Sequence, residues 1–194
     1  MKLWLHLGGN ALLLAAGYYW LGLGEARVVD VAWSAAAALI IVAGACWLHG
    51  AAFAGNRQVA LRHLPWTMLI ALVAFATYLA MPSGKWWWWI ARWIALPMLL
   101  VPFFAGAASH GWRAWRGFTP RALLAPVFVL VGVWIPLRLL AWVPRVSGFP
   151  MEMASFLLRA AIAYLLFVLA WARLAHLTSA GSPLLTQPKT ASLP

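Results

Sequence analysis

The sequence predicts an all-α, polytopic transmembrane helix bundle of about six spans. Hydrophobic residues make up 65% of the 194 residues and charged residues only 9%, which is too little polar surface to cover a soluble fold. The apolar residues gather in stretches close to the roughly 20 residues that a helix needs to cross a bilayer. These stretches are rich in Ala and Leu and lack the alternating pattern of an outer-membrane barrel. The lipid bilayer is therefore the expected solvent.

The apolar stretches are separated by short polar turns. They lie at residues 3–23, 29–53, 64–82, 88–109, 121–143 and 153–176. The first stretch is too long for a secretory signal and has no convincing small-residue cleavage site after its aromatic end, so we expect it to be retained. Residues 1–177 then form one six-helix transmembrane domain. Residues 178–194 mix Ser, Thr, Gly and Pro without periodicity, and they are expected to form a disordered cytoplasmic tail.

The basic residues predict the orientation of the chain. Most of them lie at the chain ends and in the turns after the second and fourth spans: Lys2, Arg57, Arg62, Arg113, Arg116, Arg121, Arg173 and Lys189. The opposite turns hold only Arg27, Lys85 and Arg145. The positive-inside rule therefore places both termini in the cytoplasm, with a cytoplasmic (inner) membrane as the expected location. Because topology accounts for the net charge of +11 and the basic residues form no continuous stripe, no nucleic-acid partner is expected.

Four features of the spans bear on their packing or depth. His49-Gly50 and His110-Gly111 end the second and fourth spans, and each precedes a basic turn. The sequence leaves open whether this recurrence is chance or marks three similar antiparallel hairpins.

The four tryptophans at 86–89 cannot share one helical face, so we interpret them as an interfacial anchor. Asn10 is expected to form a hydrogen bond across a helix interface, and Cys46, the only cysteine, is expected to be buried.

The histidines all map toward the cytoplasmic side of the predicted bundle. They are His6, His49, His63, His110 and His176. Imidazoles that face one another on two helices can ligate haem or a transition metal. Ordinary interfacial histidines are the favoured interpretation, because the arginine-rich turns beside them repel a cation and no inner-side carboxylate is available to orient a ring. No metal site and no cofactor is therefore expected.

Three arginines share one depth in the outer third of the predicted membrane. They are Arg92, Arg138 and Arg159. One interpretation is that they extend separately to the interface. A second is an ion-pair network with the acids on the same side, which are Asp30, Glu25 and Glu152. A third is a site for an anion or an anionic lipid, because a guanidinium matches phosphate and carboxylate groups and prolines interrupt the two neighbouring spans.

The sequence contains no recognisable catalytic arrangement. Its serines lie outside any Gly-x-Ser-x-Gly elbow, and its histidines and acids map to opposite sides of the membrane. No catalytic residue is expected, and the chain is predicted not to be an enzyme. The leading prediction is a structural or accessory subunit of a membrane complex, with a membrane-protein partner or a second copy. The alternatives are a small transporter or lipid-handling protein with an outward-facing arginine site, and a haem- or metal-binding protein that uses the inner histidines.

Overall fold

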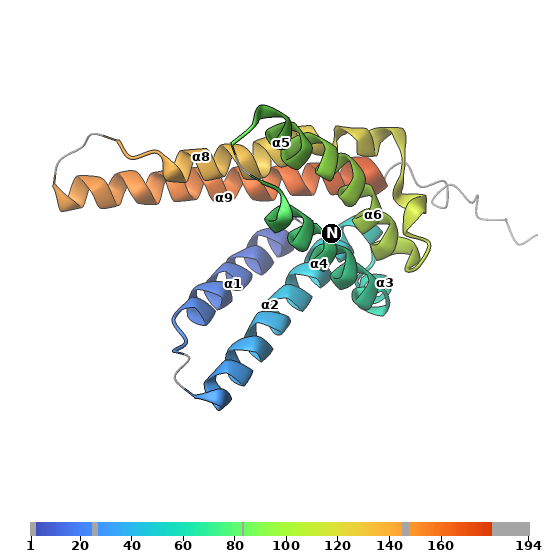
Figure 1. The fold of residues 1–194 in the computed structure, drawn as a ribbon, viewed down its shortest axis with the longest axis horizontal. Coiled ribbons are helices and arrows are strands. Elements are labelled where there is room, and N and C mark those ends of the chain that lie inside the picture. Colours follow the sequence, from blue (N-terminus) through green and yellow to red (C-terminus); the bar gives the residue numbers. More distant parts are fainter. Residues whose placement is uncertain (1–2, 25–26, 83, 145–147, 180–194) are drawn as a thin grey trace, which may run out of the picture.

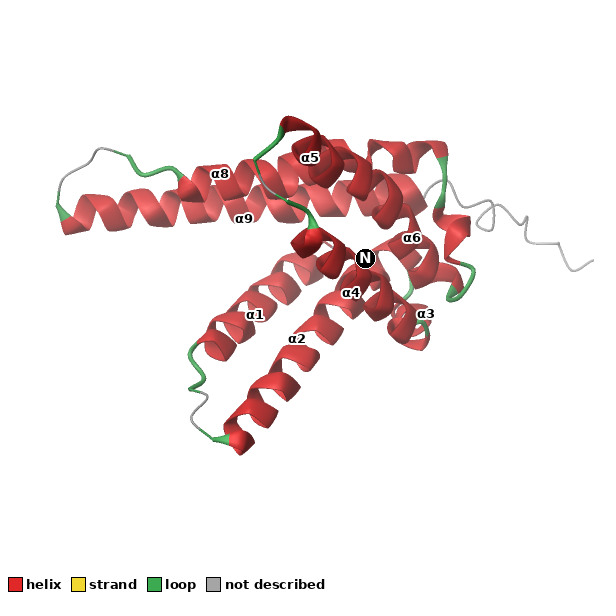
Figure 2. Ribbon diagram, viewed as in Figure 1, coloured by secondary structure: helices red, strands yellow, loops and turns green. Residues whose placement is uncertain are grey.

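The computed structural model describes residues 3–24, 27–82, 84–144 and 148–179. Every regular element within these ranges is a helix, which confirms the all-α prediction (Figures 1 and 2). The α-helices are α1 Leu3–Leu21, α2 Val28–Ala54, α3 Arg57–Arg62, α4 Leu64–Ala80, α5 Trp86–Ile90, α6 Leu96–His110, α7 Ala125–Val129, α8 Ile135–Ala141 and α9 Phe149–Ser179. Two π-turns, η1 Ala91–Ala95 and η4 Leu130–Trp134, and two 3₁₀ turns, η2 Ala114–Gly117 and η3 Pro120–Leu124, complete the order.

The helical segments correspond to the six predicted stretches. Within the described residues, four of them are long and apolar enough to cross a membrane: Val28–Ala54, Trp86–His110, Pro120–Ala141 and Phe149–Thr178. The other two are α1, whose 19 residues include His6 and Asn10, and α4, which has only 17 residues. An all-α bundle with four membrane-length helices is therefore established. At the end of α9, Thr178 and Ser179 of the predicted tail are helical, and the rest of that tail lies outside the described residues.

Neighbouring helices pack in three successive pairs. Helices α1 and α2 lie side by side, as do α8 and α9 (Figure 1), and α4 contacts α6. The pairs join where α2, α6, α7 and α9 meet around a buried apolar cluster of Phe53, Val101, Ala105, Ala108, Ala125, Leu174 and Ala175. Away from this junction the α1/α2 pair and the α8/α9 pair diverge (Figure 1). The bundle is therefore closely packed at one end and open at the other.

Both π-turns lie just before a proline. The turn Ala91–Ala95 precedes Pro97 by two residues, and Leu130–Trp134 precedes Pro136 by two. Proline has no N–H to donate to the carbonyl four residues earlier, and in each helix that carbonyl lies within the π-turn. The N–H groups of Leu96 and Ile135 instead donate to carbonyls five residues back. Both helices are thus locally widened where the sequence predicted an interruption.

The segment after α6 folds back onto that helix through a contact between two glycines. A Cβ atom on Gly106 would lie 1.9 Å from the carbonyl oxygen of Ala114, and one on Gly117 would lie 1.9 Å from the carbonyl oxygen of Pro102. Only glycine permits so close a backbone approach. This contact fixes the basic turn that carries Arg113 and Arg116 against the end of the bundle.

Candidate functional site

Arg92 closes the end of the helix that precedes it. Its Nη2 donates a 2.6 Å hydrogen bond to the carbonyl oxygen of Met81, the C-terminal cap of α4. Its guanidinium lies over the ring of Tyr78, 4.6 Å from the ring centroid. A cation at the C-terminus of a helix satisfies free carbonyl groups and opposes the negative end of the helix dipole. Arg92 therefore joins α4 to the helix that follows it.

Arg159 has the same role in the last helix pair. Its Nη1 donates to the carbonyl oxygens of Leu139 and Leu140, both at 3.4 Å, and also to that of Trp142, the cap of α8. Its Nε donates to the carbonyl oxygen of Ser155 within α9. The side chain thus forms hydrogen bonds with the last carbonyls of α8 and joins that helix to α9.

Arg138 differs from the other two arginines because it is exposed and has an aromatic partner. Its guanidinium lies 5.8 Å from the ring centroid of Trp134. The same indole packs edge-on against Trp89, with the ring centroids 6.0 Å apart. Arg138 and Arg159 lie at the same end of the α8/α9 pair, whereas Arg92 belongs to the α4/α6 pair. Of the three arginines, Arg138 remains the most available to an anionic group.

The predicted acidic partners have other roles or positions. An Asp30 oxygen accepts a 3.0 Å hydrogen bond from the backbone N–H of Arg27, which caps the start of α2. Glu152 is exposed in the first turn of α9, and Glu25 lies outside the described residues. The hydrogen bonds of Arg92 and Arg159 go to backbone carbonyls, so these two charges hold helix ends, which none of the three interpretations of the sequence described.

Two histidines meet at the junction of α1, α2 and α9. The rings of His6 and His49 pack edge to face with centroids 5.3 Å apart, and His49 packs in the same way against Trp171 at 5.1 Å. His6 is only 2% exposed. Four buried atoms here have no hydrogen-bond partner among the described residues: Nδ1 and Nε2 of His6, Nδ1 of His49 and Nε1 of Trp171. This arrangement differs from the separate interfacial histidines that the sequence favoured.

The polar groups available at this junction are two imidazole rings and one indole N–H. Two imidazoles supply half of the ligands that a tetrahedral metal site requires. In the part of the chain that the structure describes, no three His, Cys, Asp or Glu side chains form a group that could hold a metal ion. A buried polar atom without a partner destabilises a fold by about 1–3 kcal/mol. His6, His49 and Trp171 therefore form a polar defect within an otherwise apolar junction.

The remaining histidines lie apart from this pair. His63 lies between α3 and α4, where a Cβ on Gly111 would be 2.7 Å from its Nδ1. His110 is the last residue of α6, and His176 is in the last turn of α9. The pairing of His6 with His49 had one sequence signal, which is their shared depth on consecutive predicted helices.

The hydrogen bonds of α1 also differ from the sequence prediction. Asn10 is buried, but its Nδ2 donates to the carbonyl oxygen of His6 in the same helix, at 2.7 Å, and not across an interface. The bond between helices comes from Tyr164 of α9, whose hydroxyl donates to the carbonyl oxygen of Leu7. At the other end of the pair, Trp20 Nε1 donates to the hydroxyl of Ser34 at 2.9 Å and joins α1 to α2.

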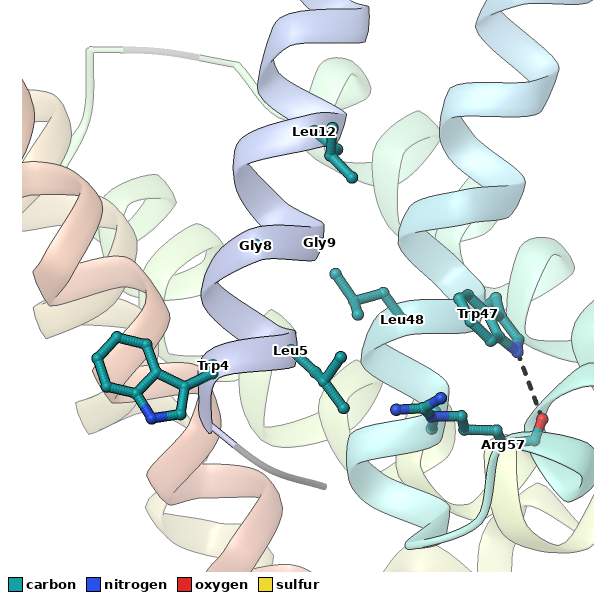
Figure 3. Close-up of a pocket in the computed structure, with 9 residues that line it drawn as sticks. Trp4, Leu5, Gly8, Gly9, Leu12, Trp47, Leu48 and Arg57 are labelled. Carbon is teal, nitrogen blue, oxygen red and sulfur yellow. Dashed lines mark hydrogen bonds between the residues drawn. The ribbon is translucent and has the colours of Figure 1, made fainter.

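A groove lies between α1 and α2 (Figure 3). Its volume is about 320 Å³. Its lining is Trp4, Leu5, Gly8, Gly9, Leu12, Trp47, Leu48, Ala51 and Arg57. No sequence pattern indicates this groove, because Gly8 and Gly9 are unremarkable in a membrane helix and Arg57 resembles the other basic residues of the turns.

Comparisons with protein-family models, with curated proteins and with solved structures found no match.

Proposed function

We propose that the chain is a non-enzymatic membrane protein that serves as a structural or accessory subunit of a membrane complex. The roles of its polar side chains support this proposal. Arg92 and Arg159 hold helix ends, Asp30 caps a helix, and Tyr164 joins two helices. These four side chains position helices.

The divergence of the two helix pairs is the observation that carries the proposal. The ring contacts between α2 and α9 join His49 and Phe53 to Phe167 and Trp171, and away from this region the pairs separate (Figure 1). Val42, two turns before His49 on the same face of α2, is 44% exposed, and Leu157, two heptads before Trp171 on α9, is 58% exposed. These apolar surfaces are unfilled within the described chain.

The unfilled face of α2 is suited to a close helix contact. Ala35 and Ala38 lie on the same face as Val42 and His49. In a bilayer, where burial in protein gives little hydrophobic gain over burial in lipid, small residues favour association by letting helix backbones approach. A transmembrane helix of a partner, or of a second copy, would complete the open end of the bundle.

Site-specific photo-cross-linking tests this proposal. A photoreactive side chain at Val42 should yield one discrete protein adduct, because that position faces the space between the pairs. The matched control is Ile40, which is 70% exposed and lies two and a half turns from His49, on the opposite face. It should yield lipid adducts. Lipid adducts alone at both positions would contradict the proposed subunit role.

For the location we propose a cytoplasmic membrane with both termini in the cytoplasm. The turns richest in arginine gather at one end of the bundle, where His63 approaches Gly111 and the segment carrying Arg113 packs on α6. The positive-inside rule assigns such an end to the cytoplasm.

A second candidate is the handling of an anion or anionic lipid near Arg138. Its support is the pair of π-turns, since Arg92 lies within one and Arg138 follows the other by four residues. Such turns often occur at functional sites. An Arg138→Gln variant that lost bound phospholipid while keeping its thermal stability would support this candidate, and unchanged lipid content would exclude it.

A further inference from the structure

The groove between α1 and α2 combines apolar walls with one charged end. Leu5 and Leu12 of α1 and Leu48 of α2 supply the walls, and the side chain of Arg57 extends toward the space between the helices (Figure 3). A groove of about 320 Å³ is at the lower end of the range for small-ligand sites. The residues that face α9, including His6 and His49, are not part of its lining, so the groove is distinct from the three-helix junction.

Arg57 is placed at the groove by a fixed backbone. The indole Nε1 of Trp47 donates a 3.3 Å hydrogen bond to the carbonyl oxygen of Arg57 (Figure 3), so the turn after α2 is held against that helix. Arg57 is exposed, and no hydrogen bond or ion pair of its guanidinium occurs within the described residues. An unpaired guanidinium at the edge of an apolar groove is suited to bind a phosphate group through two parallel hydrogen bonds.

We infer that this groove seats one acyl chain of an anionic phospholipid whose phosphate is bound by Arg57. Charge complementarity favours this occupant over a transmembrane helix, because Arg57 places an exposed guanidinium at one end of an apolar groove. An acyl chain is narrower than a helix. The headgroup of the same lipid would lie at the interface, where the segment after α2 carries the charge of Arg57.

The two glycines of the groove have different functions. A Cβ on Gly9 would lie 2.9 Å from both terminal carbons of Leu48, so Gly9 is needed for the α1/α2 contact. A Cβ on Gly8 would meet nothing within 4 Å. Gly8 therefore leaves open space for a ligand, and a side chain placed there fills the groove without disturbing the helix packing. This inference is independent of the proposed subunit role, because it concerns a different face of α1 and α2.

Native mass spectrometry of the purified full chain tests the inference. The protein is offered equal amounts of dioleoyl phosphatidylglycerol and dioleoyl phosphatidylcholine. Wild type should retain one phosphatidylglycerol with about tenfold preference, because both lipids carry a phosphate but the choline cation of phosphatidylcholine offsets that charge and repels Arg57. Gly8→Leu should lose this bound lipid, and Gly17→Leu should keep it, since Gly17 is an equally open position of α1 outside the groove.

Variants of the charged end test the headgroup contact. Arg57→Gln should reduce the preference to near one, whereas Arg62→Gln, an exposed arginine on the same short helix α3, should leave it unchanged. Leu12→Trp fills the groove from its other end and provides a second blocking variant if Gly8→Leu fails to fold, since Leu12 is 73% exposed. Equal retention of the two lipids by wild type would overturn the inference. Undiminished retention by a folded blocking variant would overturn it as well.

Discussion

Arg92 donates a 2.6 Å hydrogen bond to the carbonyl oxygen of Met81, eleven residues earlier, and so spans the turn between α4 and α5. Arg159 spans the turn between α8 and α9 in the same way. In the first pair, Trp20 and Ser34 serve this purpose with neutral groups. Each of the three helix pairs is thus held near its connecting turn by one polar side chain, and two of the three outer arginines have a structural role.

Replacing Arg92 tests its capping role. Arg92→Gln should lower the free energy of unfolding by about 1.5–3 kcal/mol, the usual contribution of a hydrogen bond from a charged group. The measurement is thermal or denaturant unfolding in a fixed detergent. Arg138→Gln is the control, because Arg138 is exposed and its guanidinium lies over the ring of Trp134 with no hydrogen bond to a carbonyl of the described residues. Equal effects of the two changes would show that capping is not the basis of the stabilisation.

Combining two arginine changes tests whether the outer arginines form one cluster. The partners of Arg92 and Arg159 are separate backbone carbonyls in different helix pairs. The Arg92→Gln and Arg159→Gln effects on unfolding free energy should therefore add to within about 0.5 kcal/mol in the double variant. A larger coupling energy in this double-mutant cycle would indicate a shared charge network.

The glycine contact on α6 should be intolerant of any side chain. Gly106→Ala places a Cβ 1.9 Å from a backbone oxygen, so it should destabilise the protein by at least the ~1–3 kcal/mol typical of overpacking. Gly17→Ala is the control, because its Cβ would meet nothing within 4 Å. That change should stabilise α1 by about 0.5–1 kcal/mol. Unfolding midpoints measured side by side would test both signs, and a tolerated Gly106→Ala would disprove the close approach.

The buried histidine pair predicts the sign of a change in the free energy of unfolding. His6→Leu removes two unpaired ring nitrogens, so the free energy of unfolding should stay unchanged or rise by about 1 kcal/mol. Tyr164→Phe, which removes a hydrogen bond to Leu7 at the same junction, should lower it. Unfolding measurements on both variants decide the matter. A marked loss of stability in His6→Leu would mean that the ring nitrogens have a stabilising partner, such as a bound ion or water.

Reporter fusions test the orientation. A reporter fused after Pro194 should be active only in the cytoplasm, and one inserted between Pro144 and Pro150 only outside it, because arginines are concentrated in the opposite set of turns. The reverse pattern would invert the membrane depth assigned to every side chain.

The all-α class and the approximate positions of the helices were predictable from the sequence, because length and apolar composition determine what a bilayer accepts. The hydrogen-bond partners of the polar residues were not predictable from the sequence. The shared depth of Arg92 and Arg159 left a common cluster open as one interpretation. The depth of a residue along its helix does not reveal which groups surround its side chain, and both side chains bind carbonyls across their own turns. The contact of Gly106 with Gly117 likewise depends on a loop folding back, which no periodic pattern encodes.

Native mass spectrometry after gentle extraction from the native membrane tests the proposed subunit role most directly. We predict a complex of fixed stoichiometry whose mass exceeds that of one 21.3 kDa chain by at least one further polypeptide, and which dissociates when a bulky charged residue replaces Val42 in the open space between the helix pairs. Single chains that carry only lipid, in wild type and in the Val42 variant alike, would contradict the account.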